Sequence, residues 1–310
     1  MMTPGPVEPP APPVLPGYLG YLLRRAYAIT RGQVQAMIPT PHGPRELAVL
    51  ATLTDQAPMS QQQLGIVAHV NRTIMVKLVD KLESHGLVTR DRNPADRRSY
   101  ALALTPKGLA MLRTLVPVAD RFEARLTANL TDVEGDRLKR LLRLLVVDAD
   151  QPSPRWLNEF TAYLVSRAHA RVRAASTQAL APLHLLPRQF GALVVVSEDQ
   201  PCTQQHLAAR LGVSAPMALQ VIDEAERLGL VTRTRNAADR RAYDLTLTPL
   251  GEERLHAAHR ALTSVGKLLR DVLGDDGEQE LCRLLRRLLA IPEPTPQPPS
   301  PEPAHPPQIR

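Results

Sequence analysis

The sequence has few aromatic residues, few cysteines and no long apolar run, and each shortage excludes a class of protein. Only 3% of the 310 residues are aromatic although 44% are hydrophobic, so the cores must be filled mainly by aliphatic side chains. The two cysteines, Cys202 and Cys282, give neither a disulfide framework nor a zinc spacing, which favours a reducing intracellular setting. No run of about 18 apolar residues occurs and no apolar signal segment follows Met1, so we expect a soluble cytoplasmic protein.

The chain contains an internal duplication. Residues 86–112, GLVTRDRNPADRRSYALALTPKGLAML, return as residues 229–255, GLVTRTRNAADRRAYDLTLTPLGEERL, with 18 of 27 positions identical. Each copy has a β-favouring run, a tip rich in arginine and a second run with alternating apolar residues, which is the pattern of a β-hairpin. Length and repeat together predict two similar domains.

The repeat sets the expected domain boundaries. We predict domains at residues 17–148 and 155–291, joined by a short linker at 149–154. The proline-rich ends, residues 1–16 and 292–310, have too few apolar residues to offset the entropy of ordering. Both are predicted to be disordered tails, with a docking role as the alternative.

Two short helices precede each hairpin at helix-turn-helix spacing. In the first copy Ser60 and Gln63 form a capping box, and after a turn at residues 69–71 a second helix ends at Gly86. In the second copy Thr203 is the cap and Gly229 the end. The residues predicted to face inward are Ile74, Leu78, Val79 and Leu82, and in the second copy Met217, Val221, Ile222 and Ala225; Met75 is predicted to face outward.

Further helices flank each unit. The spacing of apolar residues predicts long helices over residues 15–37 and 155–180, and Thr-Pro pairs at 105–106 and 248–249 begin another helix after each hairpin. A leucine-rich helix follows in each half, at 131–147 in the first. The predicted fold is therefore mainly α with small β-hairpin wings, in two winged helix-turn-helix domains.

Three motifs, present in both halves, carry a family resemblance. They are GLV-x-R at 86–90 and 229–233, Asp-Arg-Arg at 96–98 and 239–241, and Leu-Thr-x-x-Gly at 104–108 and 247–251. In this order they resemble the MarR family of bacterial transcription regulators, and the resemblance covers nearly all of each half. Family members usually have one domain per chain and act as homodimers through their first and last helices. The duplication thus implies a pseudo-dimer within one chain, with a homodimer of the whole chain as an alternative; the leucine-rich helices would otherwise cover the core of their own half.

The basic residues predict double-stranded DNA as the partner, because the net charge is +7 and arginines gather at the hairpin tips. A recognition helix reads base edges near its N-terminus, and wing arginines bind phosphates or the minor groove. We expect DNA contacts from Ser60, Asn71, Arg72, Thr73, Lys77, Arg90, Arg92, Arg97 and Arg98, and from Thr203, Ser214, Gln220, Arg233, Arg235, Arg240 and Arg241. The resemblance implies that Asp96 and Asp239 buttress a neighbouring wing arginine.

Alternatives remain for these assignments. The outer face of the helix at 72–85 would otherwise be an ordinary solvated face, and simple capping explains Ser60 and Thr203 equally well. The second copy lacks both positive charges of the first recognition helix, so we expect weaker or different base reading there. The operator is then an imperfect palindrome.

The resemblance also implies a cleft for small aromatic or lipophilic ligands. The segments that would line it contain Tyr27, His42, Phe122, His169 and His184, although each of these side chains also fits a core or surface role. The cysteines have no evident activating partner, and the close histidine pair His256 and His259 lacks a ligand pattern, so we expect structural thiols, no metal and no cofactor.

The predicted function is sequence-specific transcription regulation, as a repressor relieved by a small ligand. The alternative is an architectural or protein-interaction winged-helix protein that binds DNA without sequence preference. An enzyme is not expected, because the sequence has no glycine-rich phosphate loop and no nucleophile elbow. The effector and the operator sequence cannot be read from the chain.

Overall fold

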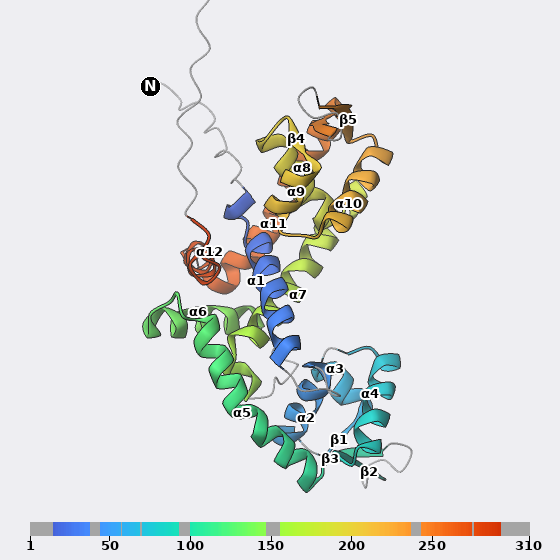
Figure 1. The fold of residues 1–310 in the computed structure, drawn as a ribbon, viewed down its shortest axis with the longest axis vertical. Helices are drawn as coiled ribbons and strands as arrows, with labels where there is room; N and C mark the ends of the chain where they lie inside the picture. Colours follow the sequence, from blue (N-terminus) through green and yellow to red (C-terminus); the bar gives the residue numbers. More distant parts are fainter. Residues whose placement is uncertain are drawn as a thin grey trace, which may run out of the picture.

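The computed structural model describes residues 15–37, 44–56, 58–68, 70–92, 100–146, 156–236, 243–274 and 276–292. Two heads lie at opposite ends of a helical hub (Figure 1). The first head is residues 44–104, the second head is residues 187–247, and the hub is the remaining helices. As predicted, the fold is mainly helical with small antiparallel sheets.

The first head is a winged helix-turn-helix. Its elements are α2 (Pro44–Gln56), β1 (Met59–Ser60), α3 (Gln61–Val67), α4 (Arg72–Ser84), β2 (Val88–Arg92) and β3 (Tyr100–Leu104). The strands lie in the order β1-β3-β2, all antiparallel. Val88 pairs with Leu104 at the base of the β2–β3 wing, and Arg92 pairs with Tyr100 at its outer end.

The second head repeats this arrangement. Its elements are α8 (Pro187–Glu198), β4 (Cys202–Thr203), α9 (Gln204–Leu211), α10 (Ala215–Arg227), β5 (Val231–Arg235) and β6 (Tyr243–Leu247). The strand order is β4-β6-β5, and Arg235 pairs with Tyr243. In both heads the chain leaves the helix-turn-helix through a glycine in the left-handed region, with φ of 70° at Gly86 and 69° at Gly229, which a side chain would disfavour.

The hub is formed by helices from both halves. They are α1 (Leu19–Met37), α5 (Pro106–Leu126), α6 (Asp132–Val146), α7 (Thr161–Leu180), α11 (Pro249–Leu273) and α12 (Gly277–Leu288), with short 3-10 turns at Leu15–Gly17, Leu157–Glu159 and Ala181–Leu183. One buried cluster joins residues from all six helices, including Leu23, Leu142, Leu164 and Leu285. The predicted pseudo-dimer within one chain is therefore present. Among the described residues no single helix is long and apolar enough to cross a membrane, although α7 with its 3-10 turn and α8, bent by 77°, pass that test as a pair.

Ion pairs between the halves complement this core. Arg137 Nη2 lies 2.7 Å from Glu280 Oε2, and Arg283 Nη1 lies 3.1 Å from Glu134 Oε1. Residues 137 and 280 occupy matching positions of the duplication, 143 apart. The two halves are thus charged oppositely where they face each other, and a pair of identical halves would place like charges there.

Each half sends its N-terminal segment to the head of the other half. Leu15 and Tyr18 pack in the core of the second head, and Trp156 and Leu157 pack against the core of the first. Leu15 and Leu157 are matching positions, 142 apart. The exchange ties both heads to the hub and makes the halves mutually dependent.

The structure corrects one position in each helix-turn-helix. Met75 is 1% exposed and Ile74 only half-buried, so the inward stripe is Met75, Leu78, Val79 and Leu82. In the second copy Ala218 is fully buried, whereas Met217 is 44% exposed. Two adjacent apolar residues at the start of a helix make the stripe ambiguous by one position, and the tertiary contacts select the one that continues the i, i+3, i+4, i+7 spacing.

Candidate nucleic-acid interface

The first recognition helix, α4, exposes polar and basic side chains at its N-terminus. Arg72, Thr73 and Lys77 are exposed on the face opposite the buried stripe. Asn71 is the N-cap, and its Oδ1 accepts a hydrogen bond of 2.9 Å from the Ile74 amide. Arg72 and Lys77 thus face solvent where base edges would be reached, whereas the Asn71 side chain serves the helix itself.

Salt bridges hold α4 in position, and Arg90 takes part in them. Lys81 Nζ lies 2.9 Å from Glu46 Oε1 on α2. Arg90, on β2, lies 2.6 Å from Asp80 Oδ1 and 3.3 Å from Glu83 Oε2, both on α4. The guanidinium predicted to contact DNA therefore connects the wing to the recognition helix.

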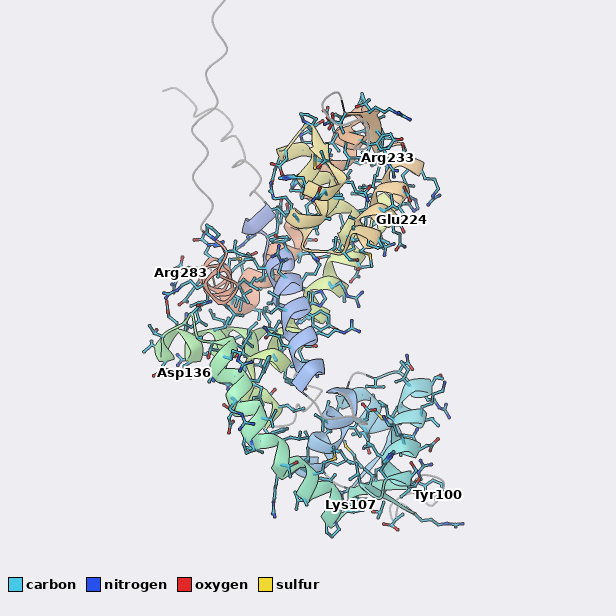
Figure 2. The ribbon with its side chains drawn as sticks, in the orientation of Figure 1. Tyr100, Lys107, Asp136, Glu224, Arg233 and Arg283 are labelled. Carbon is cyan, nitrogen blue, oxygen red and sulfur yellow. The ribbon has the colours of Figure 1, made fainter. Side chains whose placement is uncertain are left out.

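The second recognition helix, α10, repeats the wing contact of α4 with the same charges, but its contact to α8 has the opposite charges to the contact of α4 with α2. Arg233, on β5, pairs with Asp223 and lies 3.2 Å from Glu226 Oε2. Glu224 accepts from Arg188 on α8 at 2.9 Å, and this contact lowers the pKa of Glu224. Arg233 and Glu224 both belong to the second head, at the opposite end of the molecule from Tyr100 and Lys107 (Figure 2).

The wings present arginine beside tyrosine at their outer ends. Arg92 and Arg235 are exposed, and their cross-strand partners Tyr100 and Tyr243 are 53% and 44% exposed. Tyr100 lies at the outer edge of the first head (Figure 2). Neither tyrosine was among the candidate interface residues identified from the sequence. Their matching positions in the repeat, 143 residues apart, could have indicated them. Arg97, Arg98, Arg240, Arg241, Asp96 and Asp239 lie outside the described residues.

The cap residues Ser60 and Thr203 serve their own helices. Ser60 Oγ accepts from the Gln63 amide at 3.2 Å while the Ser60 amide donates to Gln63 Oε1 at 2.9 Å, which is the predicted capping box. Thr203 Oγ1 accepts from the His206 amide at 3.2 Å. Ser214 is at the N-cap of α10 but makes no capping hydrogen bond, so its exposed hydroxyl differs in this respect from Asn71.

Known proteins resemble each of the two halves of this chain. Two family models described as MarR family match residues 44–100 and 185–242. A transcriptional regulatory protein for the hcr operon of Thauera aromatica is 34% identical over 140 residues, which is 44% of this chain and 84% of that protein. The chain belongs to the MarR family. It carries two MarR domains in tandem and is a DNA-binding transcriptional regulator.

Other relatives align with one half of this tandem MarR protein. The HTH-type transcriptional repressor Rv2887 of Mycobacterium tuberculosis (strain ATCC 25618 / H37Rv) is 33% identical over 132 residues, which is 42% of this chain and 94% of that protein. Among solved structures, the transcriptional repressor CouR bound to a 23-mer DNA duplex is 29% identical, covers 45% of this chain and 99% of that chain, and has a TM-score of 0.43.

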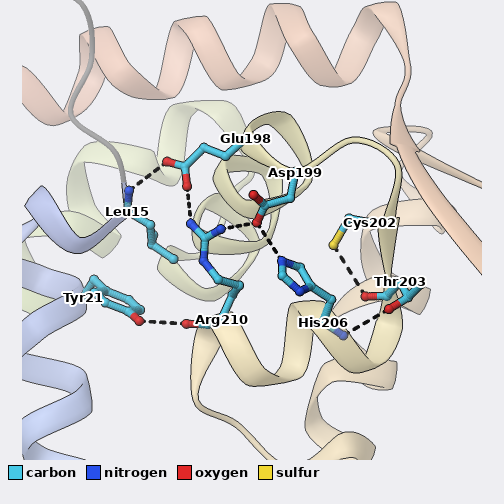
Figure 3. Close-up of polar contacts among 8 residues, drawn as sticks. All are labelled: Leu15, Tyr21, Glu198, Asp199, Cys202, Thr203, His206 and Arg210. Atoms are coloured by element: carbon cyan, nitrogen blue, oxygen red, sulfur yellow. Dashed lines mark hydrogen bonds and ion pairs between the residues drawn. The ribbon is translucent and has the colours of Figure 1, made fainter. Parts of the chain in front are cut away.

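The second MarR head is tied to the hub by a polar network (Figure 3). The Tyr21 hydroxyl of α1 donates to the Arg210 carbonyl at 2.7 Å, and the Arg210 guanidinium pairs with Glu198 and Asp199. Glu198 also accepts from the Leu15 amide at 2.8 Å. The end of α9, directly before the recognition helix, is therefore fixed to helix α1 of the other half.

The hub also reaches the turns of both helix-turn-helix units. Arg24 of α1 donates to the Leu211 carbonyl, which lies at the end of α9. Arg167 of α7 donates to the Val67 carbonyl at the end of α3, at 3.4 Å. The hub therefore contacts the end of the helix that precedes each recognition helix.

Two of the predicted ligand residues meet between α1 and α7. The rings of Tyr27 and His169 stack with centroids 4.8 Å apart, and they line a hollow of about 310 Å³ together with Ser166, Ala170 and Arg173. Burial, reinforced by Arg173 and Arg24, lowers the pKa of His169 to about 4, so the ring is neutral near pH 7.

The other predicted ligand residues lie elsewhere. Phe122 is buried in the hub core, and His184 is exposed, at a φ of 54°. His42 lies outside the described residues. The predicted site thus reduces to the Tyr27–His169 pair, because Phe122 serves the packing of the hub and His184 points to solvent.

The cysteines and histidine pair offer little chemistry. Burial raises the pKa of Cys202 to about 11 and that of Cys282 to about 12, so both thiols stay protonated. His259 Nδ1 lies 2.7 Å from the Tyr18 hydroxyl and His256 Nδ1 lies 2.8 Å from the Glu252 carbonyl. No group of three or more metal-binding side chains occurs within the described ranges.

Proposed function

We propose that this protein is a sequence-specific repressor that binds one operator with both heads of a single chain. The observation that carries the proposal is that one hub core joins helices of both halves, and each of the two heads attached to it exposes the N-terminal face of its recognition helix. Two such heads meet successive major grooves when half-sites lie about one helical turn apart. The relative Rv2887, named a transcriptional repressor, supports repression as the direction of control.

The proposal divides the basic residues by task. Arg72 and Lys77 read base edges from α4. The exposed Arg92 and Arg235, together with Arg97, Arg98, Arg240 and Arg241 at the tips, bind phosphates or the minor groove, buttressed by Asp96 and Asp239. Arg90 and Arg233 act by positioning, because their guanidinium groups are paired with carboxylates of the recognition helices.

The proposal includes relief by a small aromatic ligand. The hollow beside Tyr27 and His169 opens between α1 and α7, and these helices hold the ends of α9 and α3 through Arg24 and Arg167. A flat aromatic group can pack against the stacked rings, and Arg173 provides a positive charge for a carboxylate. A ligand that separates α1 from α7 would change the spacing of the heads.

Footprinting tests the DNA function. The full chain is titrated onto the promoter region of its own gene neighbourhood with competitor DNA at about 0.15 M salt. We expect protection of a discrete site containing two half-sites, with one chain per site by mass measurement. Uniform coating without preference over competitor would refute specific repression and favour the architectural alternative.

A second measurement tests the ligand function. Benzoate and hydroxycinnamate are added to the preformed complex, and release of the labelled duplex is followed by anisotropy. We expect release from the unaltered chain and loss of the response in His169→Leu, with DNA affinity unchanged in the absence of ligand. Equal release from both proteins would remove the Tyr27–His169 hollow from the proposal while leaving DNA binding intact.

A further inference from the structure

The two recognition helices differ in their exposed faces although their backbones match. The duplication aligns Arg72 with Ala215, Thr73 with Pro216, Val76 with Leu219 and Lys77 with Gln220, each 143 residues apart. All eight side chains are exposed. Where α4 offers two cations and a hydroxyl, α10 offers an apolar strip and one amide.

The charge of the whole helix changes accordingly. Helix α4 has three basic and two acidic residues, a net charge of +1, whereas α10 has one basic and three acidic residues, a net charge of −2. The ion pair between the recognition helix and the first helix of its head is reversed as well. Lys81 of α4 pairs with Glu46 of α2, but at the matching place Glu224 of α10 pairs with Arg188 of α8.

The apolar strip on α10 is accessible and lies beside a depression. Met217 and Leu219 are 44% and 40% exposed. An open hollow of about 340 Å³ is lined by Pro216, Leu219, Gln220, Asp223, Glu224 and Arg227. Among the described residues, the Gln220 amide donates to Glu224 Oε1 on its own helix at 3.2 Å, in an exposed contact. At the N-terminal end of this face, residues 215–220, there is no arginine or lysine to bind guanine O6 and N7; the one arginine of the hollow, Arg227, lies in the last turn of α10.

We propose that α10 reads an A·T-rich half-site through thymine methyl groups, while α4 reads a half-site containing guanine, so that the chain binds its operator in one orientation only. This inference rests on the DNA binding proposed above. Pro216 and Leu219 contact the C5-methyl groups of thymine, and Gln220 exchanges its contact with Glu224 for the N6 and N7 edge of adenine. Arg72 and Lys77 take guanine in the other half-site.

The chemistry of the major groove supports this division. Thymine is the base that presents a methyl group there, and apolar side chains recognise it by contact. The net negative charge of α10 makes phosphate attraction weak at this head, so its affinity depends on these contacts and on the wing. The cationic α4 adds to the salt-dependent affinity that the wing arginines supply.

The test removes methyl groups without altering base pairing. Duplexes of about 30 bp are selected by the full chain from a random pool, long enough for two half-sites one turn apart. Deoxyuridine then replaces thymidine in one half-site at a time. We expect each methyl contacted by α10 to contribute about fourfold in affinity, the factor for about 0.8 kcal/mol, and replacement in the α4 half-site to have little effect.

A paired variant assigns the effect to the helix. In Leu219→Ala the deoxyuridine duplex should bind as well as the thymidine duplex, because the contact is already lost. The matched Val76→Ala on α4 should retain the full difference. Undiminished sensitivity to deoxyuridine in Leu219→Ala, or equal sensitivity of the two half-sites, would overturn the inference. A pool that yields no preferred sequence would instead overturn the proposed function.

Discussion

Gly108 connects the family motif to the stability of the first head. It lies in the first turn of α5, where a Cβ atom would come 2.2 Å from the Leu87 carbonyl oxygen and 3.1 Å from its carbon. That carbonyl also accepts from the Thr105 amide at 3.1 Å. The oxygen is backbone and cannot be rotated away, so Gly108→Ala must move α5 from the base of the wing by about 1 Å, to reach ordinary van der Waals separation.

The expected loss follows from that displacement. The Thr105–Leu87 hydrogen bond, worth about 1 kcal/mol, is lengthened or lost. The packing of Leu87 and Leu112 in the head core is loosened, which costs about 1–3 kcal/mol for a partial cavity, whereas the greater helix propensity of alanine returns less than about 1 kcal/mol. We expect a net destabilisation of about 1–3 kcal/mol and a fall in Tm of about 3–10 °C in differential scanning calorimetry.

Gly135 in α6 is the matched control. An added Cβ there meets nothing within 4 Å, so Gly135→Ala should stabilise by about 0.4–1 kcal/mol. In the second head Gly251→Ala should repeat the effect of Gly108→Ala, because its Cβ would lie 2.0 Å from the Leu230 carbonyl oxygen. A Tm of Gly108→Ala at or above that of the unaltered chain would refute the explanation by close approach.

Three further predictions concern charge. Arg90→Ala should lower the free energy of unfolding by about 0.5–1 kcal/mol in urea denaturation, with little change in the salt dependence of DNA binding. Arg92→Ala should leave the stability unchanged and reduce the slope of log K against log salt by about 0.9. The opposite outcome would reverse the roles assigned to these two arginines. Glu280→Arg should lower Tm by placing a cation opposite Arg137, and the double exchange Arg137→Glu with Glu280→Arg should restore Tm. A double variant no more stable than Glu280→Arg would show that this ion pair does not stabilise the contact between the halves. The pKa of His169 falls from 6.5 to about 4 on folding, so between these values the unfolded chain binds a proton that the folded chain does not. The stability contributed by the neutral His169 ring is therefore complete above pH 6.5 and is lost as the pH falls toward 4. His169→Gln should flatten this part of the stability profile, measured by urea titrations at each pH.

The sequence alone determined the duplication, the element types and most helix ends. The capping box at Ser60, the threonine caps before α5 and α11, and the glycines after α4 and α10 were predicted and are confirmed. These features are local, because each depends on hydrogen bonds and backbone angles within a few residues. The assignments of individual residues to DNA contact remain predictions.

Only the tertiary structure decided which surfaces meet. It buried Met75 instead of Ile74, turned Arg90 and Arg233 onto the recognition helices, and brought Tyr27 against His169. It also placed the N-terminal segment of each half on the head of the other. Periodicity shows that a face is apolar or charged but not what will cover it. The partner can be distant in the sequence, as His169 is from Tyr27, and it is chosen by the packing of the whole structure.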